Sequence, residues 1–161
     1  MIALVRVDNR LIHGQVVEAW LPQLKVSRVA VADDEAAQSP LIRAAMGLAV
    51  QSSIDVLIQP LKDVAYPLIS TDPKRTLVLL RDVAGVVDAH ARGLAMSQLN
   101  LGNVHFATGR KQVSPSVFLS KSELEERQAL ARSGVEVEAR GVPSDRAVTL
   151  VEMVQRFEHT A

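Results

Sequence analysis

Thr76-Leu-Val-Leu-Leu80 is followed directly by Arg81-Asp82 and then by residues 83–91, whose apolar side chains recur at helical spacing. An almost wholly aliphatic strand of this kind predicts burial on both faces, as in a parallel sheet covered by helices. Asp82 is a typical N-cap for the helix behind the strand, and Gly93 marks the expected end of that helix. This strand–cap–helix unit predicts a fold of the α/β class.

The same alternation of short apolar runs and longer helical stretches extends in both directions from this unit. Further strands are expected at 2–7, 27–32, 54–58, 98–101, 117–119 and 135–139. Helices are expected at 14–24, 41–50, 60–69, 120–132 and 144–157, with Pro67 ending or breaking the third and Ser144 opening the last. We therefore predict one domain over residues 1–161, an open, doubly wound, mostly parallel seven-stranded sheet with helices on both faces.

Composition narrows the class of protein further. The 161 residues are 48% hydrophobic and 22% charged, which excludes intrinsic disorder, and the absence of cysteine excludes disulfides and thiol chemistry. Lys and Arg total 18, as do Asp and Glu, so the chain lacks the basic excess typical of nucleic-acid binders. No run reaches the ~20 apolar residues of a membrane helix, and Arg6 and Asp8 interrupt the apolar N-terminus, unlike a signal peptide. We expect a cytoplasmic protein that binds no nucleic acid and does not insert into a membrane.

The loop after the first strand has the closest grouping of candidate catalytic side chains in the chain. Between Arg6 and Gln15 it places Asp8, Arg10 and His13 at the carboxyl end of a strand, where open parallel sheets bind their ligands. The helix that follows offers backbone N–H groups to an anion, and Arg10 offers a planar fork that suits phosphate oxygens. A neutral imidazole in this position is a nucleophile for phosphoryl transfer. The alternative is an ordinary surface loop in which an Arg6–Asp8 pair is purely structural.

Other candidate groups have simpler explanations. His105 lies in the polar loop at 102–116 and is the main alternative to His13 as the functional histidine. His90 lies late in a predicted helix, where a structural role is expected, and His159 lies near the chain terminus, where function is not expected. The acidic run 33–35 could bind Mg²⁺, but capping of a helix is the favoured interpretation. No phosphate-binding or dinucleotide-binding glycine motif is present in the polar loop. We expect neither a metal ion nor a cofactor.

Several stretches of the sequence resemble those of a known family. Arg6-Val-Asp-Asn-Arg-Leu-Ile-His-Gly-Gln-Val16 is closely similar to the signature of the mannose/sorbose-family enzyme IIB component of the bacterial sugar phosphotransferase system (PTS). Val29-Ala-Val-Ala-Asp-Asp-Glu35 resembles the second strand and acidic turn of that family. Asn100-Leu-Gly102, Gly109-Arg-Lys-Gln-Val113 and Gly134-Val-Glu-Val-Glu138 extend the likeness over nearly the whole chain.

The resemblance implies a transferase that acts in sugar uptake. His13 would accept a phosphoryl group from a phosphohistidine of the PTS A component and pass it to a sugar held by the membrane C and D components. Arg10 would contact the phosphoryl group and Arg6 would support the loop. The other loop residues implied are Asp8, Asn9, Gly14 and Gln15, and the loop expected to face them contributes Gly102, His105, Phe106 and Lys111.

The resemblance also sets expectations for partners and location. An A domain, fused in some family members, is not found in this sequence, so a separate A protein is the expected donor. The A protein would dock on Leu11, Ile12 and the 102–111 loop. The protein itself would work in the cytoplasm, peripheral to the inner-membrane sugar permease. Two alternatives stay open: a regulatory phosphoacceptor of an incomplete PTS that transports no sugar, and a flavodoxin-like ligand-binding module.

Overall fold

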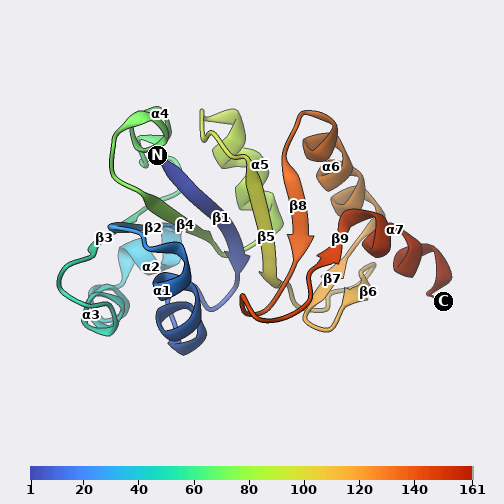
Figure 1. The fold of residues 1–161 in the computed structure, drawn as a ribbon, viewed down its shortest axis with the longest axis horizontal. Coiled ribbons are helices and arrows are strands. Elements are labelled where there is room, and N and C mark those ends of the chain that lie inside the picture. The colour runs from blue at the N-terminus through green and yellow to red at the C-terminus, as the bar shows by residue number, and fades with distance from the viewer. Residues whose placement is uncertain (161) are drawn as a thin grey trace.

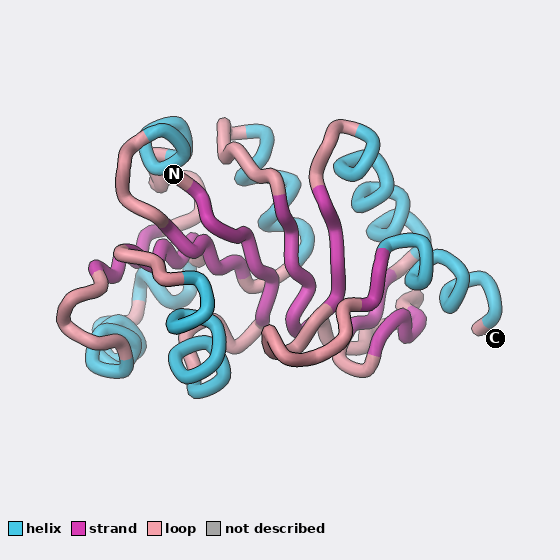
Figure 2. The backbone as a smooth tube through the Cα atoms, in the orientation of Figure 1, coloured by secondary structure: helices cyan, strands magenta, loops and turns pink. Residues whose placement is uncertain are grey.

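The computed structural model describes residues 1–160 and has a seven-stranded sheet with the strand order β3-β2-β4-β1-β5-β8-β9 (Figures 1 and 2). The strands are β1 (Ile2–Asp8), β2 (Arg28–Ala32), β3 (Asp55–Gln59), β4 (Thr76–Leu80), β5 (Gln98–Asn103), β8 (Glu136–Ala139) and β9 (Val148–Thr149). All neighbouring strands run parallel except β8 and β9. β4, whose five residues are all buried, lies inside the sheet between β2 and β1.

Helices cover both faces of the sheet, which confirms the predicted α/β class. One face is covered by η1 (Val16–Trp20), α1 (Leu21–Leu24), α2 (Asp34–Gln38) and α3 (Pro40–Ala49). The other is covered by α4 (Tyr66–Thr71), α5 (Val83–Ala91), α6 (Lys121–Arg132) and α7 (Leu150–His159). Among residues 1–160, no helix has both the length and the apolar character needed to cross a membrane.

Side-chain alternation along β1 places polar groups beneath the first helix. Val5 and Val7 join the core under α5 to α7, whereas Leu4 joins the core under η1 and α1. Because successive strand residues point to opposite faces, Arg6 and Asp8 share the face of Leu4. Both are fully buried. The sequence of β1 thus carries two charged groups into the interior at the carboxyl edge of the sheet.

Two predicted elements differ from the structure near the C-terminus. The 117–119 strand does not enter the main sheet: as β7 (Val117–Leu119) it forms an antiparallel hairpin with β6 (Lys111–Ser114). β9, a short strand within the predicted 144–157 helix, takes the seventh place in the sheet. The last helix starts at Leu150 and not at Ser144, because Thr149 and Glu152 form a reciprocal capping box.

The third predicted helix also begins late. Residues 60–65 form turns and α4 starts at Tyr66. Pro67 lies in the first turn of α4, where a missing N–H costs no intrahelical hydrogen bond. The prediction that Pro67 ends or breaks a helix is therefore wrong, and Pro67 instead helps to begin one.

Candidate functional site at the carboxyl end of β1

Asp8, the last residue of β1, accepts hydrogen bonds from the functional side chains of the first loop. Its Oδ2 accepts hydrogen bonds from Arg6 Nη2 at 3.0 Å and from His13 Nε2 at 2.9 Å. Its Oδ1 accepts from the backbone N–H of Arg10 at 3.0 Å and from Arg10 Nε at 3.3 Å. The carboxylate is fully buried, whereas the His13 side chain is 16% exposed and that of Arg10 is 43% exposed.

These contacts fix the charge of Asp8 and the tautomer of His13. Burial opposes ionisation, but the hydrogen bonds from the Arg10 backbone and His13, with the charge of Arg6, hold the pKa of Asp8 below its usual value. An ionised carboxylate only accepts hydrogen bonds, so His13 Nε2 carries the proton. In the described chain, 1–160, His13 Nδ1 has no hydrogen-bond partner. A neutral His13 therefore keeps the lone pair of Nδ1 free for attack.

Arg6 anchors Asp8 to a row of polar groups that crosses three strands. In the sheet register Arg6 of β1 faces Asn100 of β5, and Asn100 faces Glu138 of β8. Arg6 Nη1 donates to Asn100 Oδ1 at 2.5 Å, and Asn100 Nδ2 donates to Glu138 Oε1 at 3.3 Å. Arg6 also donates to the carbonyls of Arg140 and Gly141, both at 3.0 Å. Four acceptors, one on β1, one on β5 and two in the segment directly after β8, fix the guanidinium and, through it, the Asp8 carboxylate.

The guanidinium of Arg6 is also held between an indole ring and a glycine. Its Cζ lies 4.9 Å from the centre of the Trp20 ring, a cation–π contact. Trp20 Nε1 donates to the Gly141 carbonyl at 2.9 Å. A Cβ at Gly102 would lie 2.2 Å from Arg6 Cζ, so only glycine leaves room for the charged group. From the sequence, Gly102 is expected in a loop that faces the first loop; in the structure it lies in β5 and its close neighbour is Arg6.

Gly102→Ala is therefore expected to destabilise the protein and to slow phosphoryl transfer. The new methyl group must displace a buried guanidinium that is fixed on all sides, and overpacking of this kind costs about 1–3 kcal/mol. Thermal unfolding and transfer rate, measured on one preparation, test the expectation. Gly47→Ala is the matched control, because a Cβ at Gly47 meets nothing within 4 Å. Wild-type stability of Gly102→Ala would show that Arg6 is free to move.

The remaining residues of the first loop shape it around His13. Leu11 adopts a left-handed φ of 57° and is 1% exposed, and Ile12 is 7% exposed. The expectation that these two residues form a docking surface is therefore wrong, because both side chains pack into the core under η1. The helix begins directly after His13, with the Val17 N–H donating to the His13 carbonyl at 3.0 Å. A Cβ at Gly14 would meet nothing within 4 Å, which leaves open space at the start of this helix.

The loop after β5 reaches the first loop through His105 but not through Lys111. Asn9 Nδ2 donates to His105 Nε2, and Phe106 is 67% exposed with its ring edge-on to Phe118. Lys111 instead donates to the carbonyl of Thr160 at 2.9 Å and lies over the Phe157 ring, at the C-terminal helix. The structure thus brings His105 to the site residue Asn9 and places Lys111 elsewhere.

Arg81, at the end of β4, is a supporting residue that the sequence analysis did not assign. It forms a two-point ion pair with Asp33, with distances of 2.9 and 2.7 Å, and donates to the Asn9 carbonyl at 3.3 Å. Asp33 also caps α2 by accepting from the Ala36 N–H, which confirms the capping interpretation of the acidic run. Nowhere in 1–160 do three or more His, Cys, Asp or Glu side chains gather as a metal site would require.

Gln15 completes the first loop by accepting a hydrogen bond from Arg10 Nη2 at 3.1 Å. The arrangement is a partly exposed imidazole with one oriented nitrogen, a neighbouring guanidinium and a helix N-terminus. It combines a nucleophile with donors for developing negative charge, as phosphoryl transfer requires.

Comparison with known proteins identifies the family. The sequence matches the model of the PTS system sorbose subfamily IIB component over residues 2–161. It is 30% identical over 154 residues to the N-acetylgalactosamine-specific phosphotransferase enzyme IIB component 2 of Escherichia coli K12, covering 95% of this chain and 98% of that protein. It is 26% identical to the sorbose-specific EIIB component of Klebsiella pneumoniae, covering 95% and 94%.

Solved structures show the same fold. The N-acetylgalactosamine-specific IIB component 1 of Escherichia coli superposes with a TM-score of 0.82 at 26% identity, covering 91% of this chain and 97% of that one. The IIB domain of the sorbose permease of Klebsiella pneumoniae gives 0.84 at 24% identity, covering 99% and 98%.

Fold, site and relatives define the class as a IIB phosphocarrier of a bacterial sugar PTS, a transferase that acts together with other PTS components. Within that class, the chain belongs to the sorbose subfamily of IIB components. The family resemblance recognised in the sequence is confirmed. The comparisons give no better support to a regulatory module or to a flavodoxin-like binding module.

Proposed function

We propose that His13 is the phosphoryl acceptor of this IIB component and that Nδ1 is the nitrogen that carries the group. The observation that supports this most strongly is the 2.9 Å contact between His13 Nε2 and the buried Asp8 carboxylate. The contact places the proton on Nε2 and leaves the Nδ1 lone pair for attack. The other three histidines of the chain do not contact a carboxylate within residues 1–160.

The transfer step balances as a direct displacement at phosphorus. The Nδ1 lone pair forms a P–N bond, while the P–N bond of the donor phosphohistidine breaks and its electron pair returns to the donor imidazole. The His13 ring keeps its Nε2 proton and so gains positive charge. Asp8 stabilises that charge, as a carboxylate does for an imidazolium.

Arg10 and the start of the first helix are suited to stabilise the transferring group. The first backbone N–H groups of a helix have no intrahelical partners and point toward an anion. Arg10 is tethered to Asp8 and Gln15 through Nε and Nη2, and within the described chain its Nη1 has no partner. That nitrogen is available to a phosphoryl oxygen beside His13.

The donor in this proposal is a phosphohistidine of the PTS A component, and the acceptor is a sugar held by the membrane C and D components. The relatives support this order of partners at the level of the family. The protein would then work in the cytoplasm, at the inner face of the membrane that holds the permease. Phe106 and His105, beside Asn9, are the candidates for contact with the A component.

Incubation with a phosphorylated A component in the presence of excess EDTA tests the assignment. Intact mass should show the gain of one phosphoryl group, labile to acid and stable to base. Nitrogen-15 NMR of the labelled imidazoles should place it on His13 Nδ1. A phosphoryl group on another residue, or on Nε2, would overturn the proposal, and a strict Mg²⁺ requirement would contradict the metal-free step.

Replacing Arg10 should slow the transfer without unfolding the protein. Arg10→Gln removes a half-exposed side chain whose ion pair contributes at most about 1 kcal/mol. Losing one donor to a developing oxyanion costs about 10²–10³ in rate. Arg10→Lys keeps the charge but not the planar fork, so it should recover part of the activity.

Melting temperature and single-turnover transfer rate separate this role from a brace for the loop. Arg92→Gln, at the C-cap of α5, is the matched control because Arg92 is also half-exposed and paired with an aspartate. Wild-type transfer by Arg10→Gln would show that the guanidinium is idle, and a large fall in its melting temperature would show that it braces the fold.

A further inference from the structure

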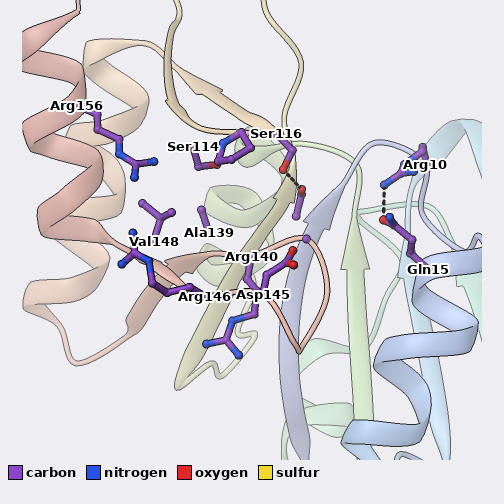
Figure 3. A pocket seen from close by; sticks show the side chains of 13 residues that line it. Arg10, Gln15, Ser114, Ser116, Ala139, Arg140, Asp145, Arg146, Val148 and Arg156 are labelled. Atoms are coloured by element: carbon purple, nitrogen blue, oxygen red, sulfur yellow. Dashed lines mark hydrogen bonds between the residues drawn. The ribbon is translucent and has the colours of Figure 1, made fainter.

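A cleft of about 560 Å³ opens beside the first loop, and apart from Arg10 and Gln15 its lining has no part in the His13 mechanism (Figure 3). Arg10 and Gln15 of the first loop lie on one side, and Arg146 and Arg156 lie on the other. Ser114 at the end of β6, with Pro115 and Ser116 in the turn of the β6–β7 hairpin, forms a third wall. The volume falls within the range of small-molecule sites, roughly 300–1,000 Å³.

Positive charge dominates the lining. Four of the thirteen lining residues are arginines, against the single carboxylate of Asp145. Arg146 and Arg156 both approach the same oxygen, Oε2 of Glu152, at 3.0 and 3.8 Å. The hydrogen bonds from Arg146 are the main reason that the pKa of Glu152 falls to about 2. Glu152 is therefore ionised at neutral pH, and two guanidinium groups share one negative charge.

Within residues 1–160, Arg156 and Arg10 each have guanidinium N–H groups that make no hydrogen bond. Arg156 makes one long hydrogen bond, from Nη1 to the Val113 carbonyl at 3.3 Å, and its 3.8 Å approach to Glu152 is too long for another. In residues 1–160 the Nε of Arg156 and the Nη1 of Arg10 have no partner. Both side chains are more than 40% exposed, so an anion in the cleft can reach them.

The rest of the lining selects among anions. Ser116 Oγ donates to the Gly102 carbonyl at 2.7 Å and keeps its lone pairs to accept a hydrogen bond, whereas Ser114 is buried. Within residues 1–160 the Asp145 carboxylate accepts one hydrogen bond, from the Val142 N–H, which leaves lone pairs for hydroxyl donors. No lining residue, all of them within 1–160, is aromatic. A nucleotide would therefore find no ring on which to stack its base, whereas a polyhydroxylated phosphate ester finds donors and acceptors for every part.

We propose that this cleft is a binding site for a phosphorylated sugar, the chemical class of the product of a sugar PTS. The phosphate would bind the arginines, and the hydroxyl groups would donate to the Asp145 carboxylate and to Ser116 Oγ. The choice of a sugar phosphate rests on the phosphocarrier function, but binding itself does not require His13. Because Arg10 belongs to both sites, a bound product would also compete with phosphoryl transfer to His13.

Isothermal titration and ¹H–¹⁵N NMR with mannose 6-phosphate and fructose 1-phosphate test the proposal. At least one should bind saturably, at least about tenfold more tightly than inorganic phosphate or unphosphorylated mannose, and shift the amides of Ser114, Ser116 and the non-proline residues of 139–148. Arg156→Gln and, independently, Arg146→Gln should weaken binding about tenfold, the effect of one lost charge-assisted contact. Arg92→Gln should bind as the wild type does, and so should His13→Ala, which separates this site from the phosphoryl acceptor.

Several results would overturn the proposal. Equal affinity for inorganic phosphate and sugar phosphate would reduce the cleft to a nonspecific anion site. Equal weakening in Arg92→Gln would show that net charge alone is responsible. The absence of saturable binding, with protection of the same amides by the A component, would assign the cleft to an acidic protein partner instead.

Discussion

His13→Gln is expected to abolish phosphoryl acceptance from the A component altogether. Glutamine offers an amide of similar reach but no ring nitrogen with a free lone pair, so no covalent intermediate can form. The fold should survive, because His13 contributes one hydrogen bond to Asp8, and Arg6 and Arg10 continue to hold that carboxylate. Intact mass after incubation with phosphorylated A component measures the result directly.

Two other histidines provide the controls. His90→Gln changes a side chain near the C-terminal end of α5, where His90 Nδ1 donates to the Leu94 carbonyl. His105→Gln changes the residue that contacts Asn9. Both proteins should still gain one phosphoryl group. Labelling that persists in His13→Gln and disappears in His105→Gln would move the acceptor to the second loop.

Much of this site could be predicted from sequence because its chemistry is local. Asp8, Arg10 and His13 lie within six positions, after a strand and before a helix, so chain order alone places them at one edge of the sheet. The aliphatic runs also predicted the parallel sheet correctly, since strands buried on both faces have few alternatives. The capping roles of Asp33, Asp82 and Ser120 followed from side chains that act within three residues.

The partners of Arg6 could not be predicted in the same way. Asn100 is 94 residues away and the Arg140 carbonyl is 134 residues away, and only the strand order β1-β5-β8 brings them to Arg6. Periodicity identifies strands but not their order. One signal was present, because Asn100 is a polar residue between two leucines in a strand that is otherwise apolar there. A buried polar group requires a buried partner, and that partner is Arg6.

The loop residues were mispredicted for a related reason. Leu11 and Ile12 directly precede His13 in the chain, and this position predicts contact with a partner that reaches His13. The left-handed backbone of Leu11 is part of a tight turn, with the Leu11 N–H donating to the Asp8 carbonyl at 2.9 Å, and both side chains are buried. Lys111 was assigned to the site by its loop, but the hairpin β6–β7 carries it to the C-terminal helix.

Asp8→Asn is expected to slow phosphoryl acceptance by about 10³–10⁴, the effect of losing a carboxylate that fixes the tautomer of a catalytic histidine. The amide can turn its NH₂ group toward His13 Nε2, which then becomes the acceptor and leaves the proton on Nδ1. The nucleophilic lone pair is lost although the ring stays in place. The charge of the phosphorylated ring would also lose its counter-ion. Nitrogen-15 NMR of His13 should show the tautomer change directly, at a pH where the imidazole is neutral and the wild-type Asp8 is ionised.

Stability must be measured alongside, because Asp8 also balances the charge of the buried Arg6. Breaking a buried ion pair by removing one partner costs about 3–5 kcal/mol, so the melting temperature should fall as well. Asp72→Asn is the control for ion-pair loss away from the site: at the opposite edge of the sheet it removes a two-point pair with Arg28, at 2.8 and 2.9 Å, and a 3.4 Å contact with the N-terminal ammonium group. That variant should lose stability and keep its transfer rate. If Asp8→Asn stays folded, keeps the wild-type His13 tautomer and transfers at the wild-type rate, Asp8 serves the fold and not the chemistry of His13.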